Sequence, residues 1–183
     1  ARFAVADTLK ETSRDAVAQL HALGVQTAML TGDNVHTARA IGQAVGIDAV
    51  HGGQLPADKL AVVDRYARSG RVGMVGDGIN DSPALARADV GFAMGALGSD
   101  AAIETADVAL MDDDLRKVAV FIRLSRATRR ILVQNIVLAL SIKTVFLAMT
   151  LAGSGTMWMA VFADVGASLL VVGNGLRLLN ARV

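Results

Sequence analysis

Two acidic residues and two glycines stand together in the segment Val75 to Pro83, which reads V-G-D-G-I-N-D-S-P. The segment follows an apolar run, Val72 to Val75, that predicts a β-strand. The glycines on either side of Asp77 allow the backbone to leave the strand sharply, and Asn80, Asp81 and the next serine can cap a following helix. Two carboxylates held so close usually need a hard cation, which indicates phosphate chemistry at this turn.

A second polar turn, Thr31-Gly32-Asp33, follows another apolar run, Val25 to Leu30. Parallel strands place both turns at one edge of a sheet. The hydroxyl and backbone N–H groups of the first turn could hold phosphate oxygens, while the carboxylates of the second hold a magnesium ion. Lys59, which begins a helix between the turns, could add a fixed positive charge. The plainer alternatives are a capped turn with solvated acids and a solvated lysine.

The elements that must position these turns are strands and helices in alternation, which predicts an α/β fold with a parallel sheet covered on both faces. The predicted strands are Val25 to Leu30, a short one from Val50, Arg71 to Val75, Val90 to Met94 and Val108 to Met111. The predicted helices begin at Thr12 or Ser13, at Asn34, at Leu55 and at Ser82, and an acidic cap at Asp112 to Asp114 starts another.

The composition is more apolar than that of an ordinary soluble domain, with 53% hydrophobic residues and a mean hydropathy of +0.46. The net charge of +1, without a basic face interleaved with aromatics, argues against a nucleic-acid partner. The absence of cysteine excludes disulfides and thiolate metal sites. His21, His36 and His51 are too scattered for a metal cluster.

Two apolar segments, 131–152 and 157–180, are each long enough to span a bilayer, and the short linker 153–156 requires an antiparallel hairpin. The basic stretch Arg123 to Arg130 marks the cytoplasmic side, and Arg177 returns to that side. We therefore expect an integral membrane protein, in a bacterial plasma membrane, with residues 1–130 cytoplasmic. The predicted divisions are 1–113 for the α/β region and 114–130 for a stalk helix, followed by the two spans and their external turn.

Lys143 and Asp164 are the ionisable residues far from the cytoplasmic ends of the two spans. They lie at similar predicted depth, because each is about 20 Å along its helix from the cytoplasmic end. One interpretation is a structural ion pair; the other is a carboxylate ligand for a transported cation, with Lys143 as its counter-ion partner. Met149, Met157 and Met159 are interpreted as gap-filling side chains.

Three motifs in order, Thr31-Gly32-Asp33, Lys59 behind Pro56, and Gly76-Asp77-Gly78-Ile79-Asn80-Asp81, resemble the second half of the phosphorylation domain of P-type cation-transporting ATPases. The resemblance implies a Rossmann-like parallel sheet of the haloacid dehalogenase type. It also implies that Asp77 ligates the catalytic magnesium and that Thr31 and Lys59 contact the phosphoryl group. The implied catalytic set is Thr31, Gly32, Asp33, Lys59, Asp77, Asn80 and Asp81.

Within that family the hairpin resembles the zinc, cadmium and lead exporters, through Asn135 and Lys143 in one span and Ala163-Asp164-Val165-Gly166 in the other. The resemblance implies that Asp164 binds the transported ion and that Lys143 neutralises it when the metal leaves. It further implies Mg²⁺ as cofactor, ATP as substrate of the full protein, and Zn²⁺, Cd²⁺ or Pb²⁺ as cargo.

One departure from the family pattern is the absence of a D-K-T-G-T motif, which carries the phosphorylated Asp. We therefore expect an inactive fragment whose partners are the actuator, nucleotide-binding and remaining membrane segments of the same pump. Two alternatives stay open at this stage. One is a non-catalytic truncated membrane protein that binds or regulates a pump; the other is a membrane-tethered phosphatase of the same superfamily.

Overall fold

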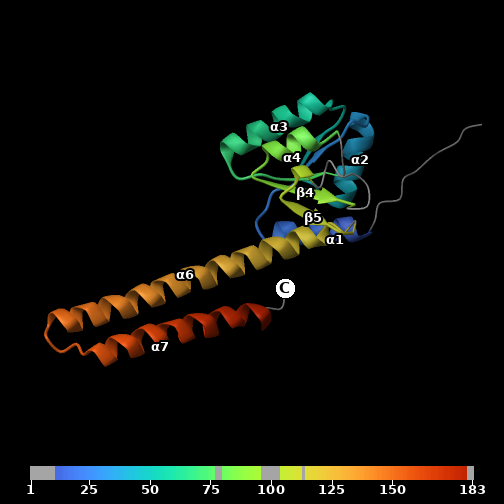
Figure 1. Cartoon of the computed structure of the whole chain (residues 1–183). Coiled ribbons are helices and arrows are strands. Elements are labelled where there is room, and N and C mark those ends of the chain that lie inside the picture. Colours follow the sequence, from blue (N-terminus) through green and yellow to red (C-terminus); the bar gives the residue numbers. More distant parts are fainter. Residues whose placement is uncertain (1–10, 77–79, 96–103, 113, 181–183) are drawn as a thin grey trace, which may run out of the picture. The chain divides into compact units, whose positions relative to one another are not determined.

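The computed structural model describes residues 11–76, 80–95, 104–112 and 114–180. The chain divides into two compact units, Ala1–Ala119 and Val120–Val183 (Figure 1). Asp77 lies outside the described residues, as do the two residues after it. Each unit is considered by itself.

The first unit alternates strands and helices, as the sequence predicts, and its strands pair in parallel. Its helices α3 and α4 lie side by side (Figure 1). The elements are α1 (Glu11–Ala22), β1 (Ala28–Leu30), α2 (Val35–Val45), β2 (Ala49–His51), α3 (Pro56–Ser69), β3 (Gly73–Gly76), α4 (Ser82–Arg87), β4 (Val90–Met94) and β5 (Val108–Leu110).

The described strands form two parallel ladders, β1-β2 and β3-β4-β5, where a single sheet was expected. Met29 pairs with Val50 in the first ladder, and Val75 pairs with Phe92 in the second. Leu30 of β1 nevertheless packs against a core cluster of the other ladder and its helices, formed by Val63, Met74, Ala84 and Leu85. The predicted α/β class is confirmed, and one apolar cluster joins the two ladders.

The helix starts test the predicted caps. Asn34 caps α2, because its side-chain oxygen accepts a hydrogen bond from the backbone N–H of His36 at 2.8 Å. The capping prediction for Thr12 or Ser13 is wrong, since α1 already begins at Glu11. Asp114 accepts from the backbone N–H of Arg116 at 3.0 Å, as expected for the start of α6.

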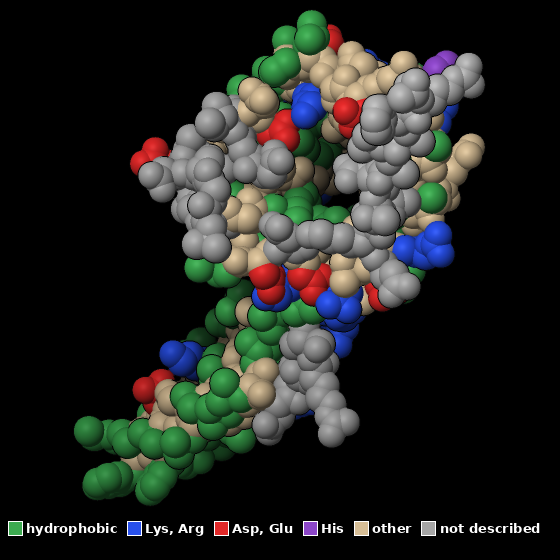
Figure 2. Space-filling view, turned by 90° about the vertical axis from the view of Figure 1, so that its right-hand side faces the viewer, with side chains coloured by type: hydrophobic (Ala, Val, Ile, Leu, Met, Phe, Trp, Pro, Cys, Tyr) green, Lys and Arg blue, Asp and Glu red, His purple; other side chains and the backbone are tan. Residues whose placement is uncertain are grey.

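The second unit contains most of α6 (Arg116–Leu151), then α7 (Met157–Leu176) and a final 3₁₀ turn, η1 (Arg177–Asn180). The predicted stalk and first span are one continuous helix. Both long helices are apolar enough to cross a membrane, with mean hydropathies of 2.0 and 1.6, and they bury almost none of that surface within the chain. Figure 2 shows hydrophobic side chains over most of this helical part, with few charges among them.

The turn between α6 and α7 depends on two glycines. Gly153 has φ of 78°, in the left-handed region that favours glycine. A Cβ on Gly155 would lie 2.8 Å from the backbone Cα of Thr150. Thr156 then caps α7 by accepting from the N–H of Met159. The antiparallel hairpin predicted from the short linker is therefore built by close backbone packing at its turn.

Candidate functional site

Lys59 and Asp81 form an enclosed ion pair in the first unit. Lys59 stands in the first turn of α3, and its Nζ donates to Oδ1 of Asp81 at 2.7 Å. The two side chains are only 15% and 12% exposed. Lys59 is therefore not the solvated surface lysine that the plainer interpretation would give. The pair joins residues 22 positions apart, so it fixes the start of α3 against the segment that follows β3.

Asp81 occupies the N-cap position of α4, but its side chain makes no capping hydrogen bond. The expectation that this carboxylate caps the helix is therefore wrong, because Lys59 holds it instead. Gly76, the last residue of β3, permits this arrangement. A Cβ there would lie 2.9 Å from Cβ of Asp81 and 3.2 Å from its Oδ2. Because Gly76 has no side chain, the last residue of β3 can lie in contact with Asp81.

The turn after β1 is ordered by its own side chains. Thr31 Oγ1 donates to Asp33 Oδ2 at 2.9 Å and accepts from the backbone N–H of Asp33 at 3.1 Å. Two hydrogen bonds fasten this turn to the loop after β2. The N–H of Gly53 donates to the Asp33 carbonyl at 2.7 Å, and the N–H of Gln54 donates to the Thr31 carbonyl at 2.9 Å. That same loop leads directly into α3, the helix that carries Lys59.

The structure thus brings the predicted site residues into two groups, Thr31 with Asp33 and Lys59 with Asp81. Gly32 and Asn80 are exposed beside them, and Asp77 lies outside the described residues. Within the ranges that the structure describes, no three His, Cys, Asp or Glu side chains converge as a metal cluster. Among the described residues, the Asp81 carboxylate and the Asn80 amide offer oxygen ligands of the type that Mg²⁺ prefers.

A second ion pair, between Asp64 and Arg87, links α3 to α4. Asp64 of α3 accepts from Nε of Arg87 of α4 at 2.7 Å, and it also accepts from Arg68 at 2.6 Å. Hydrogen bonds from Arg87 and then Arg68 lower the pKa of the Asp64 carboxyl. This ion pair holds the last residue of α4, six positions after Asp81. Sequence reasoning missed it, because Asp64 and Arg87 are 23 positions apart and neither belongs to a motif.

Lys143 and Asp164 meet across the hairpin in the second unit. Nζ of Lys143 lies 3.6 Å from Oδ1 of Asp164, and the side chains are 66% and 71% exposed. The predicted similarity in depth is thus matched by contact. The separation is longer than a charge-assisted hydrogen bond, so the carboxylate is not held by a short bond to the lysine.

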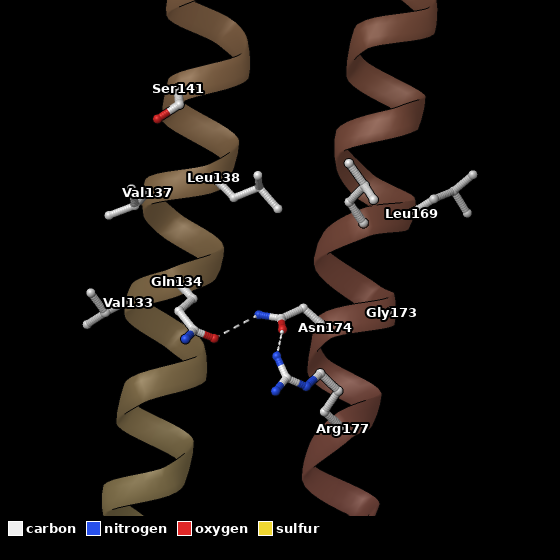
Figure 3. A pocket seen from close by; sticks show the side chains of 10 residues that line it. Val133, Gln134, Val137, Leu138, Ser141, Leu169, Gly173, Asn174 and Arg177 are labelled. Carbon is white, nitrogen blue, oxygen red and sulfur yellow. Dashed lines mark hydrogen bonds between the residues drawn. The ribbon is translucent and has the colours of Figure 1, made fainter.

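A polar cluster crosses the same hairpin nearer the end that holds the arginines. Asn174 Nδ2 donates to Asn135 Oδ1 at 2.8 Å and to Gln134 Oε1 at 3.4 Å. Arg177 Nη1 donates to Asn174 Oδ1 at 3.1 Å (Figure 3). The sequence marks these residues as among the few polar ones in the hairpin, but only the antiparallel placement of α6 and α7 brings them together.

Comparisons with known proteins bear on both units. Residues 1–89 match the family of haloacid dehalogenase-like hydrolases. The chain is 51% identical over 181 residues to a probable cadmium-transporting ATPase of Listeria monocytogenes, covering 98% of this chain and 26% of that protein. It is 50% identical over 183 residues to a cadmium, zinc and cobalt-transporting ATPase of Bacillus subtilis, covering 97% of this chain and 26% of that protein.

The chain is homologous to the carboxyl-terminal region of the cadmium- and zinc-transporting P-type ATPases. A crystal structure of a zinc-transporting PIB-type ATPase in an E2.Pi state superposes with a TM-score of 0.89 and 46% identity, covering 94% of this chain and 28% of that one. The resemblance to heavy-metal P-type ATPases is thereby confirmed, as is the haloacid dehalogenase-type region followed by two long apolar helices. The chain spans about a quarter of the length of these relatives.

Proposed function

We propose that this chain is part of an ATP-driven exporter of zinc, cadmium or a related divalent cation. In this proposal the first unit contributes to the phosphorylation site and the second supplies a membrane carboxylate for the cargo. The observation that carries the proposal is the enclosed Lys59–Asp81 pair after β3, in a chain homologous to heavy-metal ATPases over nearly its whole length.

The Thr31 turn supplies phosphate-binding groups in this proposal. Gly32 is exposed, and its backbone N–H is a hydrogen-bond donor of the kind that stabilises phosphoryl oxygens. The Thr31 hydroxyl, whose proton goes to Asp33 in this structure, would turn from Asp33 to donate to the phosphoryl group. The Gly53–Gln54 backbone holds the turn. Such prior ordering reduces the reorganisation needed when charge develops on the phosphoryl group.

Lys59 supplies the positive charge near that group. Asp81 holds the ammonium at 2.7 Å and so fixes its position rather than leaving it on a mobile stem. Asn80 completes the hydrogen bonding in this proposal. In this proposal the nucleophilic carboxylate comes from a D-K-T-G-T segment elsewhere in the pump, because residues 1–183 contain no such motif.

Magnesium fits the donor chemistry at the end of β3, where Asp77 would ligate it with Asp81 and Asn80 nearby. Bound there, the ion would neutralise phosphoryl charge. Asp81 uses Oδ1 for Lys59, so the pair leaves Oδ2 outside that hydrogen bond. The chain's own contribution is to hold carboxylate and ammonium at 2.7 Å, at the start of a helix whose preceding loop is hydrogen-bonded to the Thr31 turn.

The two long helices span the membrane in this proposal, with the arginines of α6 on the cytoplasmic side, as positive-inside topology requires. Asp164 then serves as an oxygen ligand for the transported cation. The open 3.6 Å contact with Lys143 supports this role, because a cation can replace an ammonium that forms no short hydrogen bond. Lys143 neutralises the acid again once the metal has left.

The experiment uses a complete pump in which this chain forms the carboxyl-terminal region. Asp77→Ala should abolish phosphoenzyme formation from labelled ATP, because it removes the magnesium carboxylate. Zinc binding by the membrane region should persist. Asp112→Ala, a matched loss of an exposed acid that pairs with Lys117, should phosphorylate normally. Normal phosphoenzyme in the Asp77→Ala variant would refute the proposed site.

A further inference from the structure

His51 is the last residue of β2, and its backbone and its side chain bond to two different elements. Its carbonyl accepts a hydrogen bond from the N–H of Thr31 at 3.0 Å. Its imidazole Nε2 is hydrogen-bonded to the hydroxyl of Tyr66, in α3, at 3.1 Å. The two rings also meet edge to face, with centroids 6.2 Å apart and planes at 68°. One residue therefore joins the Thr31 turn to the helix that carries Lys59.

The segment that follows His51 lies in close backbone contact with the same region. A Cβ on Gly52 would lie 2.7 Å from Cα of Val35, the first residue of α2. The next two residues, Gly53 and Gln54, donate backbone hydrogen bonds to the Thr31 turn. Movement of this segment would therefore displace the turn with it.

Tyr66 and Lys59 lie on one face of α3, because seven positions correspond to about two helical turns. Val63 stands between them on that face and is 1% exposed. It belongs to the core cluster against which Leu30, the last residue of β1, packs. Asp81 holds Lys59 at the amino end of this face, and His51 holds Tyr66 two turns later. Two hydrogen bonds thus fix the rotation and the position of α3.

We propose that His51 is a positioning residue for phosphoryl transfer, and that its bond to Tyr66 sets the distance between the Thr31 turn and the Lys59 ammonium. The inference rests on the proposed function, in which both groups contact the phosphoryl group. Without the imidazole, residue 51 still accepts from Thr31 through its backbone, but α3 loses one of its two hydrogen bonds on that face. A displacement of about 1 Å can cost up to about 100-fold in rate.

The test uses a complete pump whose carboxyl-terminal region is this chain, and it separates the rate of phosphorylation from the KM for ATP. His51→Phe keeps an aromatic ring without the nitrogen, and Tyr66→Phe removes only the hydroxyl. Each should slow phosphoenzyme formation at saturating labelled ATP about tenfold, through misplacement of the phosphoryl contacts. The KM for ATP should not change, because the nucleotide-binding segment lies elsewhere in the pump. The rate of phosphorylation from inorganic phosphate should fall as well.

Two further variants test the hydrogen bond itself. The double variant His51→Phe/Tyr66→Phe should be no slower than either single variant, since all three lack the same bond. His51→Gln, whose side-chain amide can reach the Tyr66 hydroxyl, should recover most of the rate. Additive losses in the double variant, or a Gln variant as slow as the Phe variant, would overturn the proposal.

Val45→Ala is the control for stability, because Val45 is buried at the end of α2 away from the Thr31 turn. It should lower the thermal unfolding midpoint at least as much as His51→Phe, yet phosphorylate at the unsubstituted rate. A loss of rate in Val45→Ala that matched its loss of stability would make the role of His51 merely structural. An unsubstituted pump that forms no phosphoenzyme would refute the proposed function and this inference with it. Normal rates in both Phe variants of an active pump would overturn the positioning role alone.

Discussion

The ammonium of Lys59 and the carboxylate of Asp81 lose most of their water contact in the folded chain. Among the ion pairs that the structure describes, this one is the most enclosed. Removing two charges from water is costly, and their attraction compensates only while both partners remain. Loss of one partner should therefore cost much more than loss of one member of an exposed pair.

Lys59→Met should lower the free energy of unfolding by about 3 kcal/mol, because it leaves Asp81 enclosed without its counter-charge. Lys117→Met removes one member of the half-exposed Lys117–Asp112 pair and should cost less than about 1 kcal/mol. Urea unfolding, followed by the near-ultraviolet signal of Tyr66 in α3, measures both. Equal costs would mean that the enclosure of Lys59 does not matter to stability.

The close approach of Gly76 to Asp81 gives a second prediction. Gly76→Ala places a Cβ 2.9 Å from Asp81 Cβ, so strand or acid must shift, at about 1–3 kcal/mol. Gly70→Ala is the control, because its Cβ would meet nothing within 4 Å and its backbone is extended. The same urea experiment compares them. A Gly76→Ala chain as stable as the Gly70→Ala chain would refute the packing argument.

At the scale of elements, an aspartate precedes β2, β4 and β5 and ties each strand to its neighbour. Oδ2 of Asp48 accepts from the N–H of Thr27 at 2.7 Å, that of Asp89 from Val72 at 2.8 Å, and that of Asp107 from Gly91 at 2.8 Å. These bonds lie near the amino ends of the strands, at the edge opposite the site. They help to fix the register of the strands within each ladder.

The hydrogen bonds of Asp48 make the link between β1 and β2 dependent on pH. Hydrogen bonds from the backbone and hydroxyl of Thr27 lower the pKa of the Asp48 carboxyl below its ordinary 3.8. The folded state therefore prefers the ionised form, so its stabilising effect is present above pH 3.8 and is lost as the pH falls through the lower folded value. The urea concentration at the unfolding midpoint should fall as the pH is lowered through that range. It should fall less steeply in Asp48→Asn. An unchanged acid slope in the variant would contradict this account.

Much of the element pattern could be predicted from the sequence, because glycine turns and apolar runs punctuate it. Val90 to Met94 matches its predicted strand, and Asn34 caps α2 as expected. The strand before Thr31 is shorter than predicted, since only Ala28–Leu30 pairs with β2. The sequence shows that an aspartate directly precedes each of β2, β4 and β5, and this repetition is a signal that these side chains have a common role. Its bond to the neighbouring strand depends on register, which the motifs do not specify.

At the scale of the whole molecule, the two units divide the proposed work between phosphate chemistry and cargo binding. Thr31, Lys59 and Asp81 are predicted as site residues from motif order, but the contact between Lys59 and Asp81 arises from packing of α3 against α4. The hairpin's Lys143–Asp164 contact was foreseen from helix depth, because a helix advances by a fixed rise per residue. To predict the Asn135–Asn174 hydrogen bond, one must also know which sides of α6 and α7 face each other, and helix depth does not give this.

The central claim is that the membrane carboxylate binds cargo while phosphate chemistry proceeds in the first unit. The most direct measurement is phosphorylation of a complete pump containing this chain, from ATP with zinc and separately from inorganic phosphate. Asp164→Ala should abolish zinc-stimulated ATP hydrolysis and zinc binding, yet retain phosphorylation from inorganic phosphate. Ser168→Ala, which removes a hydroxyl bonded to the helix's own backbone, should retain both activities. Full zinc binding and zinc-stimulated hydrolysis in Asp164→Ala would contradict the claim and leave that acid as a structural partner of Lys143.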